Sequence, residues 1–372
     1  MKRPTSLIAL LSLALGPITS SSNEIPPINA VKKEMVTLSV TIDKNKYDLE
    51  TQVLTPPAKS LRPLAIVTHG SPRHGSSRPK MTTHQYFARA MEFARRGYVT
   101  AIVMRRGYGQ STGRWHEEYG DCDSPHYDKA AFTTARDIIA AIDELKKRPG
   151  IDPNRILVVG QSAGGIGAVA VAAKNTHGVA AVINFAGGRG SRSHGEVCSE
   201  GELVDTFKIL GETSRIPTLW VYAENDGYFN PHLARQFYDA FTQAGGRADF
   251  IQTGPFSTDG HRLFSRSGIA QWRPIVDNFL RKIGLPTWQT PPELPRAVVI
   301  EPPHGLSERG QKSWSRYLNK ANNKAFAKSR TGSRYGWRSS RNTIEEAKKF
   351  AMGSCKADDC AIISINGSPP LW

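Results

Sequence analysis

Several kinds of segment are missing from this chain, and each absence excludes a class of protein. Beyond the N-terminus no apolar run is long enough to cross a bilayer, which excludes a membrane-spanning enzyme. No internal repeat is evident and no known nucleic-acid-binding module is present, so we expect no nucleic acid among the partners. There is no Cys-x-x-Cys pair and no histidine at zinc-like spacing from a cysteine, so we expect no metal site.

Cysteine is scarce, and its use indicates an oxidising compartment. The four cysteines allow three disulfide pairings. We favour Cys122 with Cys198 and Cys355 with Cys360, because each pair then lies within one expected domain. Disulfides persist in secreted and periplasmic proteins and are rare in the cytosol.

The N-terminus has the pattern of an export signal. Two basic residues precede an apolar segment at residues 7–15, and small residues follow at 19–22. The apolar segment is too short to anchor the protein in a membrane. We therefore expect residues 1–22 to be a signal peptide cleaved near residues 20–22, and the mature protein to be periplasmic or secreted.

Positive charge is abundant, with a formal net charge of +16. Such a surface either only keeps the protein soluble or gives it an affinity for anionic partners. In an exported protein those partners are anionic envelope polymers, lipid head groups or anionic substrates. Contact with an anionic envelope surface is therefore one expectation.

The organisation of the chain changes near residue 285. Residues 23–285 alternate between apolar strands and helices, which predicts a mostly parallel sheet covered by helices on both faces. Within them, a polar stretch at about 187–215 is too long for an ordinary connection, and we expect a functional insertion over the site. Residues 286–306 are rich in proline and predict a linker.

Residues 307–372 predict a small basic α+β domain. The patterns favour a helix within 307–325, a strand at 325–329 and a strand at 361–365. Between the strands, Asn342 followed three residues later by Glu345 predicts a helix that begins with a capping box.

The strongest local signal is Gly160-Gln161-Ser162-Ala163-Gly164. An apolar, β-branched run precedes it, and a run of small apolar residues typical of a buried helix follows it. A serine at such a strand-to-helix turn stands clear of the backbone and within reach of a base, which identifies the motif as a nucleophile elbow. A glycine-rich turn with an incidental serine is the alternative.

The serine needs a base, and the base needs an acid to orient it. In this kind of sheet the chain order is serine, acid, histidine, and Asp226 and His261 each follow a core strand. Both therefore lie at the sheet edge that carries Ser162. Glu224 and Asp259 lie close enough in sequence to be alternative acids.

Attack on a carbonyl forms an oxyanion, which two backbone N–H groups must stabilise. We expect the first from Ala163, directly after the nucleophile. We expect the second from Ser71, with Gly70 as the second choice, in the loop after the strand that ends near residue 69. Tyr108 either points at the site or belongs to an ordinary turn.

Together these motifs resemble the α/β-hydrolases, near the dienelactone-hydrolase and peptidase-like esterase branch, over residues 35–285. The resemblance implies a Ser162–Asp226–His261 triad that forms an acyl-enzyme, with no metal or organic cofactor. Dienelactone hydrolases carry a cysteine nucleophile where this chain has Ser162, which favours an ester as substrate. The residues that carry the resemblance are His69-Gly70, the 106–113 loop, Gly160-x-Ser162-x-Gly164, Asp226 and Gly260-His261.

The C-terminal part resembles a small domain of unknown function in exported bacterial proteins. The shared marks are Ala325-Phe326-Ala327, Gly336-Trp337, an alanine-bearing helix at 345–352 and the two last cysteines.

The leading hypothesis is an exported serine esterase that acts on a small-molecule carboxylic ester. The alternatives are a peptidase of the same fold and a non-catalytic envelope-binding protein that acts through its basic C-terminal domain. Retention of serine, acid and histidine in the catalytic order favours an enzyme over the last of these.

Overall fold

Eight strands of this protein form one sheet in the order β1-β2-β4-β3-β5-β6-β9-β10. The computed structural model describes residues 26–57, 60–294, 298–320 and 322–371, so the expected signal peptide lies outside the described residues. The strands are β1 (Lys32–Ile42), β2 (Asn45–Thr55), β3 (Arg62–Thr68), β4 (Val99–Val103), β5 (Ile151–Gln161), β6 (Val179–Phe185), β9 (Thr218–Ala223) and β10 (Ala248–Thr253).

The six strands from β4 to β10 in this order run parallel to one another. Their central members are runs of Val, Ile, Leu and Ala that are buried on both faces, as a covered parallel sheet requires. The long hairpin β1–β2 adds an antiparallel edge. Its two-residue turn, Asp43-Lys44, has positive φ at both positions, which matches the twist of the hairpin.

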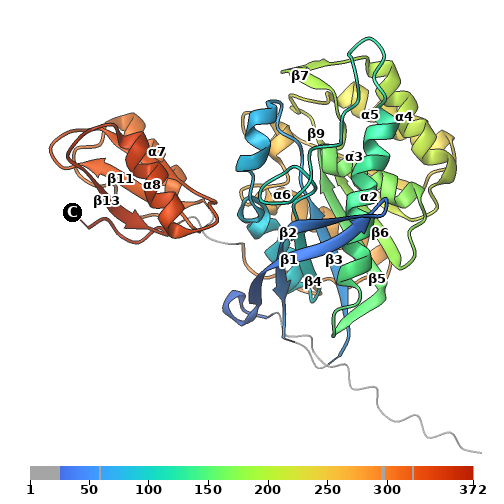
Figure 1. The fold of residues 1–372 in the computed structure, drawn as a ribbon, viewed down its shortest axis with the longest axis horizontal. Coiled ribbons are helices and arrows are strands. Elements are labelled where there is room, and N and C mark those ends of the chain that lie inside the picture. Colours follow the sequence, from blue (N-terminus) through green and yellow to red (C-terminus); the bar gives the residue numbers. More distant parts are fainter. Residues whose placement is uncertain (1–25, 58–59, 295–297, 321, 372) are drawn as a thin grey trace, which may run out of the picture.

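Helices cover both faces of the sheet, as predicted (Figure 1). Helices α1 (Phe87–Arg95) and α6 (Ile269–Lys282) pack into one apolar core, and four other helices pack into the core on the opposite face. Those four are α2 (Tyr127–Leu145), α3 (Ala163–Ala173), α4 (Glu200–Thr213) and α5 (Pro231–Gln243). The mostly parallel sheet with helices on both faces, expected from the sequence, is therefore confirmed.

The stretch at 187–215 differs from the expectation of one insertion over the site. Its first part forms a short hairpin of β7 (Ser191–Ser193) and β8 (Glu196–Val197). Its second part is α4, an ordinary covering helix that buries Leu203, Phe207 and Leu210 against α5 and the sheet. The residues of this stretch that line the candidate site are 188–191, at its start, so the part beside the site is shorter than predicted.

The C-terminal part forms a second, smaller sheet with order β12-β11-β13 (Figure 1). Helix α7 packs on one face of this sheet and α8 on the other, each with its own small apolar core. The elements are α7 (Glu308–Leu318), β11 (Ala325–Ser329), β12 (Tyr335–Arg338), α8 (Ile344–Cys355) and β13 (Cys360–Ile365).

Two details of this domain differ from the sequence prediction. The predicted cap, Asn342, is off by one residue: Thr343 caps α8, and its hydroxyl accepts a hydrogen bond from the Glu346 N–H at 3.1 Å. Strand β12 was not predicted at all, because Gly336 interrupts its alternation of apolar and polar residues.

The disulfides join Cys122 to Cys198 and Cys355 to Cys360, the pairing favoured from the sequence. The first ties the loop after β4 to the end of the β7–β8 hairpin, and the second ties the end of α8 to the start of β13. Among the described residues, none of the helices is both long and apolar enough to cross a membrane.

Candidate active site

The backbone at Ser162 turns sharply between the end of β5 and the start of α3. Ser162 has φ 54° and ψ −123°, a sparsely populated conformation that costs about 1–3 kcal/mol. The flanking glycines are required by close packing: a Cβ at Gly160 would lie 2.1 Å from the Gly164 carbonyl oxygen, and a Cβ at Gly164 would lie 2.4 Å from that of His69. The geometry is that of a nucleophile elbow.

Asp226 and His261 meet at the ends of β9 and β10. Nδ1 of His261 lies 3.1 Å from both carboxylate oxygens of Asp226. Asp226 is itself held by the backbone N–H groups of Tyr228 and Phe229, which donate to its Oδ1 at 2.8 and 3.1 Å. Both side chains are buried, so this carboxylate fixes the orientation of the imidazole.

The two alternative acids are placed elsewhere. The Asp259 Oδ1 accepts hydrogen bonds from the backbone N–H groups of Gly227 and His261, so this carboxylate shapes the loop rather than facing the ring. Glu224 is exposed. Of the three carboxylates considered from the sequence, Asp226 is the one in contact with the imidazole.

Gln161, the residue before Ser162, links the elbow to the histidine loop. The Gln161 side-chain amide donates a hydrogen bond to the His261 backbone carbonyl at 2.9 Å, which ties the elbow to the histidine loop. Within the described part of the chain, the Ser162 hydroxyl makes no hydrogen bond to a protein atom, and His261 Nε2 makes none either. Both groups are therefore available to a substrate and to each other.

The loop after β3 contains both backbone N–H groups that were considered as the second oxyanion donor. The N–H of Gly70, the second choice, donates to the Tyr86 hydroxyl at 3.1 Å and is already used. The N–H groups of Ser71 and Ala163 have no protein acceptor among the described residues, and both residues line the same cavity as Ser162. The arrangement leaves two backbone donors beside the serine.

His69 is a structural histidine in this loop. Its Nδ1–H donates to the Gly70 carbonyl at 2.7 Å, and its Nε2 accepts from the Arg105 backbone N–H at 3.1 Å. Complete burial, followed by the nearby Arg105 cation, lowers the pKa of His69 well below its usual value. The ring therefore stays neutral and fixes the backbone that precedes Ser71.

A buried ion cluster lies beneath Ser71. Glu117 pairs with Arg105 and, at 2.8 Å, with Arg189. Burial alone would raise the pKa of the Glu117 carboxyl, but the two guanidinium groups outweigh burial and hold that pKa well below its usual range. The Tyr108 hydroxyl lies 2.9 Å from both Glu117 Oε2 and Ser71 Oγ, so the cluster is connected directly to the loop after β3.

A cavity of about 410 Å³ opens beside Ser162. Arg73 and Tyr228 line it: the Arg73 guanidinium lies 3.8 Å from the Tyr228 ring centroid. Behind this wall, the Tyr228 ring stacks 3.8 Å from the His261 imidazole. Arg73 also donates to Ser191 Oγ at 2.8 Å, which connects the stack to the β7–β8 hairpin. The hairpin thus borders the cavity at Ser191, and the Cys122–Cys198 disulfide holds the chain directly after β8.

Sequence reasoning missed several of these residues. Tyr228 stands two residues after Asp226, and an aromatic residue beside the acid was a usable signal. Glu117, Arg105 and Arg189 lie on three separate segments with no periodicity, and no local pattern pairs them. Tyr108 was named as either a site residue or a turn residue, and its contact with Ser71 favours the first.

The chain is similar in sequence to one known family and in fold to known esterases. The family model for X-Pro dipeptidyl-peptidase (S15 family) matches residues 46–226, from β2 to the loop that holds Asp226. Among solved structures, the esterase Pf2001 of Pyrococcus furiosus aligns at 14% identity over 72% of this chain and 97% of its own, with a TM-score of 0.50. Esterase 2 of Thermogutta terrifontis, phosphorylated by paraoxon, aligns at 16% identity over 71% of this chain and 98% of its own, with a TM-score of 0.49.

No curated protein matches the chain. The family model ends at residue 226, so the resemblance of residues 307–372 to a domain of exported bacterial proteins stays a prediction.

Proposed function

Because this chain belongs to the α/β-hydrolase superfamily, we propose that it is a serine hydrolase that cleaves a small-molecule carboxylic ester. The observation that carries the proposal is the contact of His261 with Asp226 at the strand ends beside the strained Ser162 turn. Ser162 is the nucleophile, His261 the general base and Asp226 the orienting acid.

In the first step the Ser162 hydroxyl attacks the ester carbonyl while His261 Nε2 takes its proton. The carbonyl oxygen becomes an oxyanion that the N–H groups of Ser71 and Ala163 stabilise. The imidazolium then gives its proton to the departing alcohol, which leaves an acyl group on Ser162. Water, deprotonated by His261, attacks the acyl-enzyme, and collapse releases the carboxylic acid and the free serine.

The test is hydrolysis of p-nitrophenyl esters of increasing acyl length by the mature protein. We expect Ser162→Ala and His261→Ala to lose about 10⁴-fold or more in kcat while circular dichroism stays unchanged. Asp226→Asn should lose a similar factor, because the imidazole loses its orienting charge. Glu224→Gln is the matched control two residues away and should keep full activity. Full activity in Asp226→Asn would refute the role of the acid.

Because the mechanism uses no metal or organic cofactor, dialysis against EDTA should leave the rate of ester hydrolysis unchanged.

Peptide hydrolysis is a second candidate, because the matching family model is that of a dipeptidyl-peptidase. An X-Pro p-nitroanilide distinguishes the two candidates. Cleavage of the anilide with kcat/KM above that of the best ester would make the protein a peptidase, and the same Ser162→Ala variant would then abolish it.

Export is proposed on the N-terminal pattern and on the two disulfides. Fractionation of cells that express the full chain tests it. The mature protein should appear outside the cytoplasm, shortened by about the 22 expected residues.

A further inference from the structure

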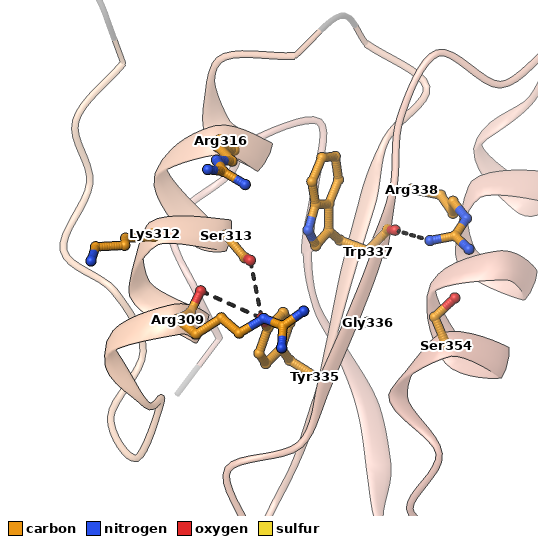
Figure 2. A pocket seen from close by; sticks show the side chains of 9 residues that line it. All are labelled: Arg309, Lys312, Ser313, Arg316, Tyr335, Gly336, Trp337, Arg338 and Ser354. Atoms are coloured by element: carbon orange, nitrogen blue, oxygen red, sulfur yellow. Dashed lines mark hydrogen bonds between the residues drawn. The ribbon is translucent and has the colours of Figure 1, made fainter. Parts of the chain in front are cut away.

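The C-terminal domain contains a groove that the proposed chemistry does not use. It has a volume of about 420 Å³ and runs along the outer edge of β12, between α7 and the end of α8 (Figure 2). β12 is an edge strand, because the sheet order is β12-β11-β13. The space is of the size that proteins use to hold an organic ligand rather than a single ion.

The groove is lined by cations without acids. Arg309, Lys312 and Arg316 follow one another along α7 at a spacing of three and four residues, and all three line the groove. Figure 2 shows the Arg309 and Arg316 side chains on the side of α7 that faces β12. Lys312 is paired with the exposed Glu308. Within the described residues, neither Arg309 nor Arg316 has a carboxylate partner, and no Asp or Glu lines the groove.

Aromatic side chains form the wall between these cations and the strand. Tyr335 and Trp337 alternate along β12, so both face α7, where they pack against its apolar core and stay half-buried (Figure 2). The Tyr335 hydroxyl is fixed 3.0 Å from Ser313 Oγ. Sugar rings present C–H groups that pack against aromatic faces, so this wall suits a chain of sugar units.

The charge of the whole domain has the same sign. Residues 307–372 contain 13 Lys or Arg and 5 Asp or Glu, a net charge of +8, which is half of the chain's +16 in less than a fifth of its length. A domain of this kind attracts polyanions at long range, and the groove gives that attraction a defined site.

We propose that this groove binds an acidic polysaccharide, with Arg309 and Arg316 contacting its anionic groups and Trp337 its sugar rings. Arginine suits this role because its planar fork donates two hydrogen bonds to one carboxylate. Bound in this way, the domain would hold the hydrolase domain on an anionic polymer.

Three other polyanionic or extended ligands fit the groove less well. An added peptide strand would need the outer backbone groups of β12, but Arg338 already donates to the Trp337 carbonyl at 2.9 Å. The Cys355–Cys360 disulfide places the domain in oxidising surroundings, where nucleic acid is not the common polyanion. A membrane surface would need exposed apolar side chains beside the cations, and the lining holds none besides the two aromatic residues.

The test measures binding of the full mature chain to polygalacturonate by biolayer interferometry, with neutral dextran and an oligo-dT strand as comparison ligands. The groove variant is Arg309→Gln with Arg316→Gln. The matched control is Lys348→Gln with Lys349→Gln on α8, which removes the same charge from the same domain away from the groove.

We expect the groove variant to bind polygalacturonate about tenfold or more weakly, because hydrogen bonds to charged groups each contribute substantially. The control should change less than twofold, and wild-type affinity should fall as salt rises. Circular dichroism verifies that both variants fold. Equal losses in the two variants, equal binding of dextran, no binding of polygalacturonate, or tighter binding of oligo-dT would each overturn the assignment.

Discussion

Arginine has opposite uses in the two parts of this molecule. In the hydrolase domain, Arg105 and Arg189 are buried and held on both sides of Glu117. In the C-terminal domain, Arg309 and Arg316 are exposed along a groove without carboxylate partners among the described residues. The first pair stabilises the fold, and the second is available to bind a ligand.

The difference shows how burial decides the role of a charge. A buried charge must be paired because its desolvation costs several kcal/mol, so the hydrolase domain matches its inner arginines with acids. Further buried pairs there follow the same rule: Arg106 with Asp137, Arg96 with Asp277 and Arg273 with Glu92. An exposed arginine carries no such requirement, and its charge is available to a partner.

Glu117 is the residue whose substitution should cost the most. Glu117→Gln leaves two buried guanidinium groups without a counter-charge, and breaking a buried ion pair in this way costs about 3–5 kcal/mol. It also weakens the acceptor for the Tyr108 hydroxyl, which lies 2.9 Å from Ser71 Oγ, so ester hydrolysis should fall with stability. Urea unfolding and p-nitrophenyl ester kinetics measure the two effects.

Glu118→Gln is the control for this substitution, since Glu118 is the exposed neighbour that lines the cavity. It should change the free energy of unfolding by less than about 0.5 kcal/mol. If Glu117→Gln were as stable as Glu118→Gln, the buried ion cluster would not stabilise the fold.

The same carboxylate makes stability depend on pH. Its pKa in the folded protein lies below the ordinary 4.5, so the stability it contributes is complete above that pH and is lost as the pH falls toward the folded pKa. Wild type should therefore lose stability below about pH 4.5 more steeply than Glu117→Gln. Urea unfolding midpoints measured at pH 7, 5, 4 and below give the dependence of stability on pH for both proteins. Equal dependence in wild type and Glu117→Gln would mean that the Glu117 carboxylate is not the group responsible.

The two domains are constrained by disulfides of very different loop length. Cys122–Cys198 closes a loop across 76 residues, whereas Cys355–Cys360 spans only 5. Loop-closure entropy gives about 4.5 kcal/mol for the first and about 2 kcal/mol for the second. Calorimetry of the two Cys→Ala double variants measures both, and neither should lose ester hydrolysis at a temperature where it is folded. A larger loss of stability on removal of Cys355–Cys360 than of Cys122–Cys198 would contradict the loop-closure estimate.

Local and periodic features of this protein could be predicted from the sequence. The apolar runs predicted the parallel sheet, and the glycines around Ser162 predicted a strand-to-helix turn. The turn is present, and Ser162 adopts a positive φ there. The chain order predicted that Asp226 and His261 would meet, and their contact is present.

Features that depend on distant segments could not be predicted. Glu117 pairs with Arg105 and Arg189 across irregular segments, whose sequences show neither helical nor strand periodicity. Helix α4 is a different case: Leu203, Phe207 and Leu210 follow one another at helical spacing, and its polar residues obscured that pattern.

The smallest predicted effect belongs to the exposed arginines. Arg309→Gln with Arg316→Gln removes two charges without breaking an ion pair among the described residues. The free energy of unfolding should therefore change by less than about 0.5 kcal/mol. Thermal unfolding of the full chain measures this change beside the polysaccharide binding of the same variant. A loss of more than about 2 kcal/mol would mean that these arginines support the fold as Arg105 does, because an unpaired surface charge supplies no such stability. Weak binding together with unchanged stability is the result that separates a ligand-binding arginine from an architectural one.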